Sequence, residues 1–119
     1  MFSGIETTQV DVLVIGAGPA GMAAAIAARQ AGVSNLVVLE REPEMGGILK
    51  QCIHNGFGLH RFKEELTGPE YAQRDMDQVQ ALGIDVRCGT TVLSVSPDRV
   101  VTAISRQAGV QLFQAGAIV

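Results

Sequence analysis

The stretch DVLVIGAGPAGMAAAIAARQAG, residues 11–32, decides the fold of this chain. It opens with a short β-branched apolar run, which is typical of a strand buried on both faces. From Pro19 to Ala31 the residues are nearly all strong helix formers, and Gly32 stands where a helix would end. Residues 35–40, NLVVLE, form a second apolar run of the same type. Together these segments predict a βαβ unit with parallel strands.

A glycine-rich motif joins the predicted strand to the predicted helix. It consists of Gly16, Ala17, Gly18, Pro19, Ala20 and Gly21, a G-x-G-x-x-G pattern. The pattern alone is weak, but here it follows a strand, opens a helix and is followed nineteen residues after Gly21 by Glu40 at the end of the next strand. This combination favours a dinucleotide-binding unit over a glycine turn kept only for packing.

Each position of the motif has a physical role in such a unit. Gly16 permits the tight turn, Gly18 lacks the Cβ that would keep the backbone away from a pyrophosphate, and Gly21 lets the helix pack close to the strand. Backbone N–H groups at the helix N-terminus would hold the phosphate charge. Glu40 can accept hydrogen bonds from both ribose hydroxyls of an adenosine and would repel a 2′-phosphate.

Length, charge and composition restrict the function classes. The 119 residues with 47% apolar content suffice for one hydrophobic core, so we expect a single domain. The net charge of −3, without a run of like charges, offers no basic surface to a nucleic acid. No apolar run is long enough to span a bilayer and no signal-peptide pattern is visible, so a cytoplasmic location is expected.

The remainder of the chain predicts one helix and several strands. Thr67 and Glu70 have the spacing of a capping box, which predicts a helix over about 69–82. Residues 84–96, which include Cys88, alternate as a strand does. Three further strand-like runs are separated by turns that contain glycine. They cover residues 99–105, 110–115 and 117–119.

The first half of the sequence resembles a known family. DVLVIGAGPAGMAAAIAARQAG, VVLERE (residues 37–42) and the doublet Gly46-Gly47, in this order, look like the FAD-binding half of the two-dinucleotide flavoprotein oxidoreductases, the group of glutathione reductase and thioredoxin reductase. The resemblance implies an α/β fold, a Rossmann-like FAD/NAD(P)-binding domain with a central parallel sheet and a β-meander. It also implies that FAD is the cofactor, that Gly46 and Gly47 lie near its pyrophosphate, and that Arg41 belongs to the site.

A narrower resemblance extends further along the chain. GGILKQCIHNGFGLHRFKEELTGPEYAQR, residues 46–74, is similar to a bacterial and archaeal subgroup of NAD(P)/FAD-dependent oxidoreductases associated with glycerol-3-phosphate dehydrogenase-like flavoproteins. Such a flavoprotein, or another electron-transfer protein, is therefore an expected partner. The resemblance implies a flavin contact for Asn55. Within GTTVLSV, residues 89–95, it implies a backbone contact between Val92 and adenine.

Cys52, His54 and His60 lie in the loop that carries this narrower resemblance. They could be a redox thiol with a base, three metal ligands, or bystanders in a loop laid against the cofactor. Position 57 holds Phe57, so the C-x4-C redox disulfide of the glutathione type is unavailable. Zinc usually needs four groups or three plus water, and no further ligand stands nearby at ligand spacing. The sequence favours a cofactor loop without a metal.

The predicted function is the FAD-binding portion of an oxidoreductase that passes a hydride between NAD(P)H and flavin. An NAD-binding dehydrogenase domain and a non-catalytic FAD-binding or electron-transfer subunit remain alternatives, and no residue is an obvious catalytic acid or nucleophile. The buried-type run that ends at Val119 suggests a chain incomplete at its C-terminus, so residues 1–119 would be the N-terminal part of the FAD domain with the nicotinamide domain absent. Such a chain is expected to be inactive alone and to self-associate, for example as a homo-oligomer, through an uncovered flank of the sheet.

Overall fold

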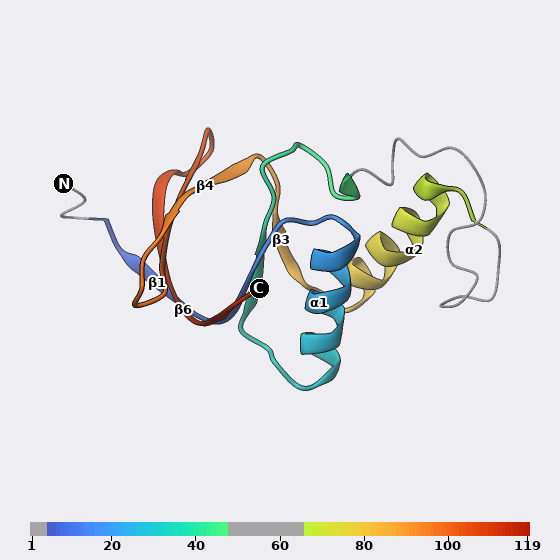
Figure 1. The fold of residues 1–119 in the computed structure, drawn as a ribbon, viewed down its shortest axis with the longest axis horizontal. Coiled ribbons are helices and arrows are strands. Elements are labelled where there is room, and N and C mark those ends of the chain that lie inside the picture. The colour runs from blue at the N-terminus through green and yellow to red at the C-terminus, as the bar shows by residue number, and fades with distance from the viewer. Residues whose placement is uncertain (1–4, 48–65) are drawn as a thin grey trace.

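A computed structural model describes residues 5–47 and 66–119, and within them two helices lie to one side of a curved six-stranded sheet (Figure 1). The helices are α1 (Pro19–Gln30) and α2 (Gly68–Ala81). The strands are β1 (Thr7–Ile15), β2 (Leu36–Leu39), β3 (Asp85–Arg87), β4 (Thr90–Val95), β5 (Val100–Ser105) and β6 (Gly109–Ile118). None of the described helices is long and apolar enough to cross a membrane.

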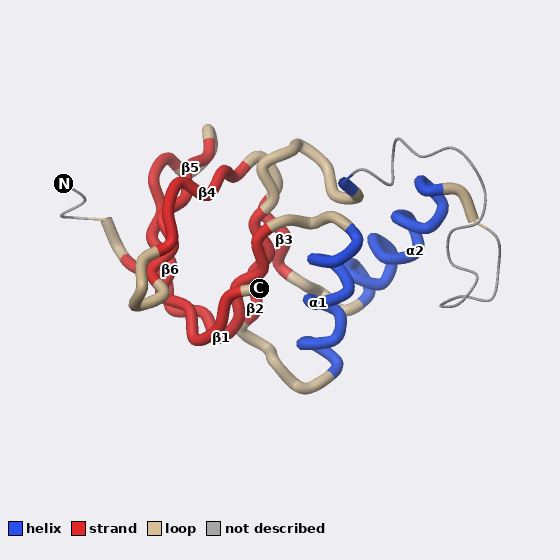
Figure 2. Tube along the Cα trace, viewed as in Figure 1, coloured by secondary structure: helices blue, strands red, loops and turns tan. Residues whose placement is uncertain are grey.

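The sheet has the order β3-β2-β1-β6-β5-β4 and combines two kinds of pairing (Figure 2). β1 pairs in parallel with β2 on one side and with β6 on the other, and β2 pairs in parallel with β3. β4, β5 and β6 form an antiparallel meander. The predicted α/β fold, with a parallel centre and a β-meander, is confirmed.

The prediction of separate strands over 110–115 and 117–119 is wrong, because β6 is continuous from Gly109 to Ile118. The sequence predicts a turn at Gly116. It lies instead inside the strand, where a Cβ would come within 2.9 Å of the Asp11 carbonyl oxygen on β1. The residue is glycine because two backbones approach closely here, which is the other common reason for a glycine in a strand.

The prediction of one strand over 84–96 also needs correction. The segment is broken between β3 and β4 at Cys88 and Gly89, and Gly89 has a φ of 65° that a strand does not allow. Cys88 therefore lies in the link between two strands and not on a strand. This break lets the chain leave the parallel edge of the sheet and start the meander.

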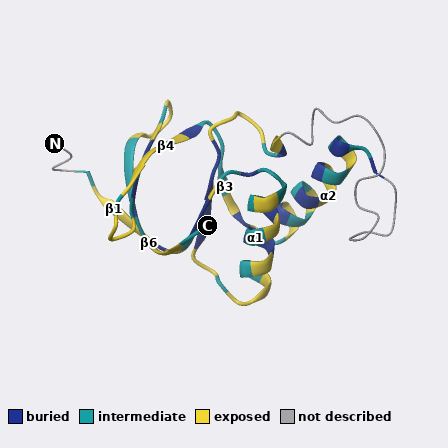
Figure 3. Ribbon diagram, viewed as in Figure 1, coloured by how far each residue is buried: buried dark blue, intermediate teal, exposed yellow. Residues whose placement is uncertain are grey.

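Two hydrophobic cores lie on opposite faces of the parallel strands. One core joins the helices to the sheet and includes Met22 and Ile26 of α1 with Val14 and Val38 of the strands. The second joins the parallel strands to the meander across the inside of the curved sheet, with Phe113 fully buried in it. Figure 3 shows buried residues along parts of the curved sheet and along parts of both helices.

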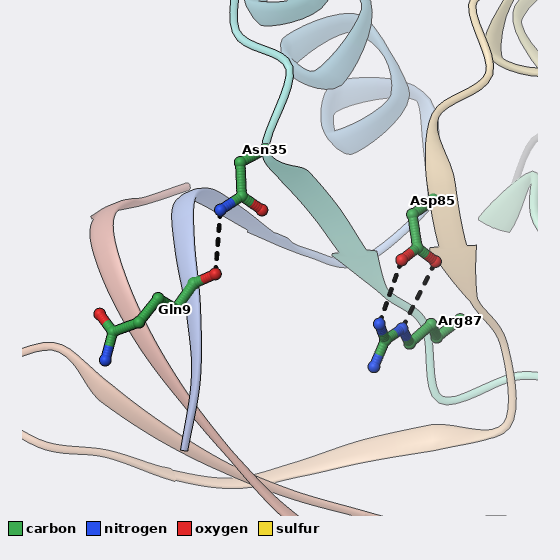
Figure 4. Close-up of polar contacts among 4 residues, drawn as sticks. All are labelled: Gln9, Asn35, Asp85 and Arg87. Atoms are coloured by element: carbon green, nitrogen blue, oxygen red, sulfur yellow. Dashed lines mark hydrogen bonds and ion pairs between the residues drawn. The ribbon is translucent and has the colours of Figure 1, made fainter. Parts of the chain in front are cut away.

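Side chains at the ends of the short strands tie the curved sheet together (Figure 4). Asn35, just before β2, donates from its side-chain amide to the Gln9 carbonyl at 2.9 Å. On β3 the Arg87 guanidinium pairs with the Asp85 carboxylate at 3.1 Å. The same guanidinium lies 5.5 Å from the centre of the Phe113 ring, a cation–π distance. Arg87 thus covers the second core on its open side.

The capping box predicted at α2 is confirmed. The Thr67 hydroxyl accepts from the Glu70 backbone N–H at 3.3 Å, and Glu70 accepts from the Thr67 backbone N–H at 2.9 Å. Because the Thr67 N–H donates to the ionised carboxylate, it lowers the pKa of Glu70. The end of α2 also matches the prediction, since Leu82 caps the helix and Gly83 follows with a φ of 64°.

We predict that Phe113→Ala lowers the free energy of unfolding by about 3–5 kcal/mol, because it empties the centre of the second core. The matched control is Leu93→Ala on β4, where 56% of the side chain is exposed and a change of at most about 0.5 kcal/mol is expected. Urea unfolding followed by circular dichroism measures both. Equal losses in the two variants would contradict the assignment of the meander core.

Candidate functional site

The glycine motif forms the turn from β1 into α1. Gly16 has a φ of 99°, a conformation that favours glycine. A Cβ on Gly21 would lie 1.8 Å from the Gly16 carbonyl oxygen and 3.4 Å from a methyl carbon of Val14. Nothing but a hydrogen fits there, so the close packing of helix on strand that the sequence predicted for Gly21 is confirmed.

Backbone hydrogen bonds fix part of this turn and leave the rest open. The Gly16 N–H donates to the Leu39 carbonyl at 2.8 Å, and the Ala17 N–H donates to Glu40 Oε1 at 2.8 Å. Three N–H groups find no acceptor among the described residues. They belong to Gly18, Ala20 and Gly21. The first turn of α1 holds no acidic residue, and its N-cap contributes no side-chain hydrogen bond. An anion at this helix N-terminus would meet unsatisfied donors and the positive end of the helix dipole.

The second glycine doublet packs directly on the first glycine turn. The Gly46 N–H donates to the Ala17 carbonyl at 2.8 Å. A Cβ on Gly47 would come within 3.0 Å of the Gly18 Cα and 3.6 Å of the Pro19 Cδ. Gly46 and Gly47 have φ values of 116° and 58°, which explains glycine at both positions. The two glycine segments therefore form one unit, and their contact with a pyrophosphate stays a prediction.

Glu40 lies at the end of β2, and only 7% of it is exposed. Besides the bond from Ala17, its Oε2 accepts from the Glu42 backbone N–H at 2.8 Å. The main chain of Glu40 is also engaged, since its N–H donates to the Arg87 carbonyl at 3.0 Å and its carbonyl accepts from the Thr90 N–H at 2.9 Å. The carboxylate borders the cavity described next, while its predicted contact with ribose is untested.

A cavity of about 850 Å³ opens beside these groups. Its size suits a nucleotide-sized ligand. Strand ends, the segment after β2 and the start of β4 line it. The lining residues are Ile15, Gly16, Leu39, Glu40, Arg41, Glu42, Pro43, Glu44, Met45, Gly47, Thr90, Thr91 and Val92. Five predicted site residues thus meet at one cavity: Gly16, Glu40, Arg41, Gly47 and Val92.

The charge of the lining is mainly negative. Glu40, Glu42 and Glu44 contribute carboxylates, and Arg41 is the single cation among the lining residues. Arg41 Nε lies 3.6 Å from Glu42 Oε1, and both side chains are largely exposed. The positive charge of Arg41 is therefore partly balanced by the carboxylate of Glu42. A phosphate group bound here in addition to the pyrophosphate would face three carboxylates and be repelled by them.

Several lining residues were not anticipated from the sequence. Thr90 and Thr91 reach the cavity because the Gly89 N–H donates to the Glu42 carbonyl at 2.9 Å, which brings the start of β4 next to the end of β2. Met45 reaches it from the segment that leads into the second glycine doublet. Only the family resemblance of GTTVLSV pointed to this part of the cavity, and it did so through Val92 alone.

Asn55, Cys52, His54 and His60 lie outside the described residues, so their predicted roles remain predictions. Over residues 5–47 and 66–119, no three side chains of His, Cys, Asp or Glu come together in a group that could hold a metal ion. The site that the structure does describe is built from backbone donors, one buried carboxylate and a cavity.

Comparisons with known proteins agree with this geometry. Residues 11–60 match the family described as FAD binding domain. The glutamate synthase [NADPH] small chain of Escherichia coli is 38% identical over 90 residues, which are 76% of this chain and 17% of that protein. The thioredoxin reductase of Ureaplasma parvum is 35% identical over 77 residues, which are 64% of this chain and 23% of that protein. The chain holds an FAD-binding domain of the FAD/NAD(P)-dependent oxidoreductase superfamily.

A solved structure gives the fold of this FAD-binding domain independently. The L-proline dehydrogenase of P. horikoshii superposes with a TM-score of 0.77 over 96% of this chain and 22% of that chain, at 20% sequence identity. The FAD-binding domain therefore spans about a fifth of the length of the relatives that it matches.

We predict that Gly21→Ala destabilises the FAD-binding domain by roughly 3 kcal/mol or more, the upper end of the cost of overpacking, because the new methyl group would overlap the Gly16 carbonyl. Gly18→Ala is the matched control. Its Cβ would lie 4.0 Å from the Gly47 Cα, an ordinary contact, so a cost of about 1 kcal/mol or less is expected. Thermal unfolding without ligand compares the two variants. A Gly21→Ala variant as stable as Gly18→Ala would show that the turn is built differently.

Proposed function

We propose that this domain holds FAD by its ADP half in the cavity, and that it serves an oxidoreductase in which a hydride passes between NAD(P)H and the flavin. The observation that carries the proposal is the set of three N–H groups at the N-terminus of α1, those of Gly18, Ala20 and Gly21, that find no acceptor in residues 5–47 and 66–119. They stand at the glycine unit that borders the cavity. A pyrophosphate is the part of a dinucleotide that requires such donors.

The residues present fit the ADP half of the cofactor. The free N–H groups would bind the pyrophosphate, and the absence of a Cβ at Gly18 and Gly47 leaves the backbone accessible there. The Glu40 carboxylate would accept from ribose hydroxyls with the lone pairs that its two backbone donors leave unused. The adenine would lie toward Val92 at the start of the meander.

The redox part of the proposal depends on groups beyond this cavity. Bound FAD supplies the hydride acceptor, and the domain contributes binding and orientation. The name of one relative, the glutamate synthase [NADPH] small chain, supports a nicotinamide as the hydride donor. The 119 residues carry one G-x-G-x-x-G fingerprint, so we propose that NAD(P)H is bound by other residues. A glycerol-3-phosphate dehydrogenase-like flavoprotein, or another electron-transfer protein, is the proposed partner.

The same cavity could bind the ADP half of NAD, because the G-x-G-x-x-G motif contacts only the ADP half, which FAD and NAD share. A dehydrogenase domain that binds NAD is therefore the second candidate. A domain that binds FAD without ever being reduced by NADH is the third. The three candidates differ in which dinucleotide binds tightly and in whether the bound flavin is reduced.

We predict that the 119-residue chain binds FAD, that ADP displaces it, and that NADH is oxidised no faster than by free FAD. The shift of the flavin absorption band on binding measures the first two results, and absorbance at the NADH band measures the third. Tight binding of NAD with none of FAD would favour the dehydrogenase. Steady NADH oxidation above the rate of free FAD would show that a complete active site is present in these residues.

We further predict that the cavity discriminates against a 2′-phosphate. ADP should displace FAD at least about tenfold better than the analogue that carries an additional 2′-phosphate. A ratio of ten corresponds to about 1.4 kcal/mol of repulsion. The repulsion comes from the carboxylates of Glu40, Glu42 and Glu44 around the single cation of Arg41. Competition titrations with the two nucleotides provide the ratio. Equal affinities would mean that the ribose lies away from these carboxylates.

A further inference from the structure

The carboxylate of Glu40 is held by hydrogen bonds within the chain. Its carboxylate is nearly buried, and each oxygen accepts a backbone N–H at 2.8 Å, Oε1 from Ala17 and Oε2 from Glu42. A buried carboxylate is costly unless it is hydrogen-bonded, and bonds from N–H groups to an ionised oxygen are among the stronger ones in proteins.

The two donors come from different segments. Ala17 belongs to the first glycine turn, and Glu42 begins the segment that leads to the second glycine doublet. The carboxylate therefore joins the two segments whose glycines pack on each other at Gly18 and Gly47. It also takes up the Ala17 N–H, so that the donors left for an anion begin at Gly18.

The main chain of Glu40 extends this junction to the far side of the cavity. Its N–H donates to the Arg87 carbonyl at the end of β3, and its carbonyl accepts from Thr90 at the start of β4. One residue thus connects β2, both glycine segments and the strands that bring Val92 to the cavity.

We propose that Glu40 is a positioning residue that gives the dinucleotide site its shape, in addition to any contact that it makes with ribose. Its carboxylate orients the Ala17 and Glu42 peptides and thereby sets the direction of the free N–H of Gly18. The proposal rests on the proposed function only in taking the ligand to be an adenine dinucleotide. The orientation of the two peptides rests on hydrogen bonds made within the chain itself.

The chemistry of the side chain makes the proposal testable. A carboxylate offers two acceptor oxygens, whereas the amide of Gln offers one acceptor and one donor group. In Glu40→Gln, the side-chain NH₂ would face either the Ala17 N–H or the Glu42 N–H, and that backbone bond is lost. The variant keeps the size of the side chain, so any change reports on the hydrogen bonds and the charge.

The first experiment measures amide hydrogen exchange by NMR in the unchanged chain without ligand. We expect the Ala17 and Glu42 amides to exchange at least tenfold more slowly than those of Gly18 and Ala20, which have no acceptor among the described residues. Rapid exchange at both Ala17 and Glu42 would overturn the proposal. This arm needs no variant to fold.

The second experiment repeats the measurement on Glu40→Gln and titrates it with ADP. Exchange at Ala17 or Glu42 should speed up at least tenfold more than at Leu13 and Val37 in the sheet, and the affinity for ADP should fall. A purely structural loss would accelerate all protected amides through global unfolding, so the difference between sites is the decisive reading. The matched control is Asp11→Asn on β1, an exposed carboxylate changed to an amide, which should alter neither exchange at these sites nor affinity.

The outcomes separate the two proposals. Weaker ADP binding by Glu40→Gln with unchanged exchange at Ala17 and Glu42 would mean that the carboxylate serves only the ligand, and the positioning role would be wrong. Protected amides in an unchanged chain that binds neither ADP nor FAD would contradict the proposed function while the positioning role stands.

Discussion

The contact between Gly21 and the Gly16 carbonyl is the constraint on which the rest of the site depends. A Cβ placed on Gly21 would lie 1.8 Å from that oxygen, so α1 approaches β1 as closely as two backbones allow. This approach determines where the first turn of α1 presents its free N–H groups. It also places the core residues Met22 and Ile26 against the sheet. A substitution at Gly21 would therefore disturb both the packing of α1 on β1 and the position of the N–H groups at its first turn.

The second glycine doublet follows from the first. Because the turn is narrow at Gly18, another backbone can approach it, and Gly47 does so at a distance that admits no Cβ. The sequence explains Gly18 by the approach of a pyrophosphate. The structure adds a neighbour from the chain itself, since the Gly46 N–H donates to the Ala17 carbonyl at 2.8 Å. A pyrophosphate would thus enter a space bounded by two glycine segments that are already in contact.

Local signals in the sequence predicted more than non-local ones. The βαβ unit, the turn at Gly16 and the capping box of Thr67 and Glu70 depend on residues close together in the chain, and all three are confirmed. The break at Gly89 was missed because strand propensity continues through it, and the role of Gly116 was missed because its neighbour on β1 is distant in sequence. For the site, spacing indicated Gly16 and Glu40, and the family resemblance added Gly47 and Val92. Thr90 and Thr91 were not predictable, since they reach the cavity through the hydrogen bond from the Gly89 N–H to the Glu42 carbonyl, two residues far apart in sequence.

The position of Glu40 raises an electrostatic question, because a carboxylate stands close to a helix N-terminus that suits a phosphate. Its two backbone donors resolve part of this conflict, since they satisfy the charge where the side chain is buried. One of them, the Ala17 N–H, is thereby removed from the donors of the glycine turn, and those that remain lie on Gly18, Ala20 and Gly21. The negative side chain and the anion would thus use separate sets of N–H groups. An adenine dinucleotide matches this division, because its ribose carries the 2′- and 3′-hydroxyls and the 5′-pyrophosphate at different positions of the sugar, whereas an additional 2′-phosphate would bring charge against charge.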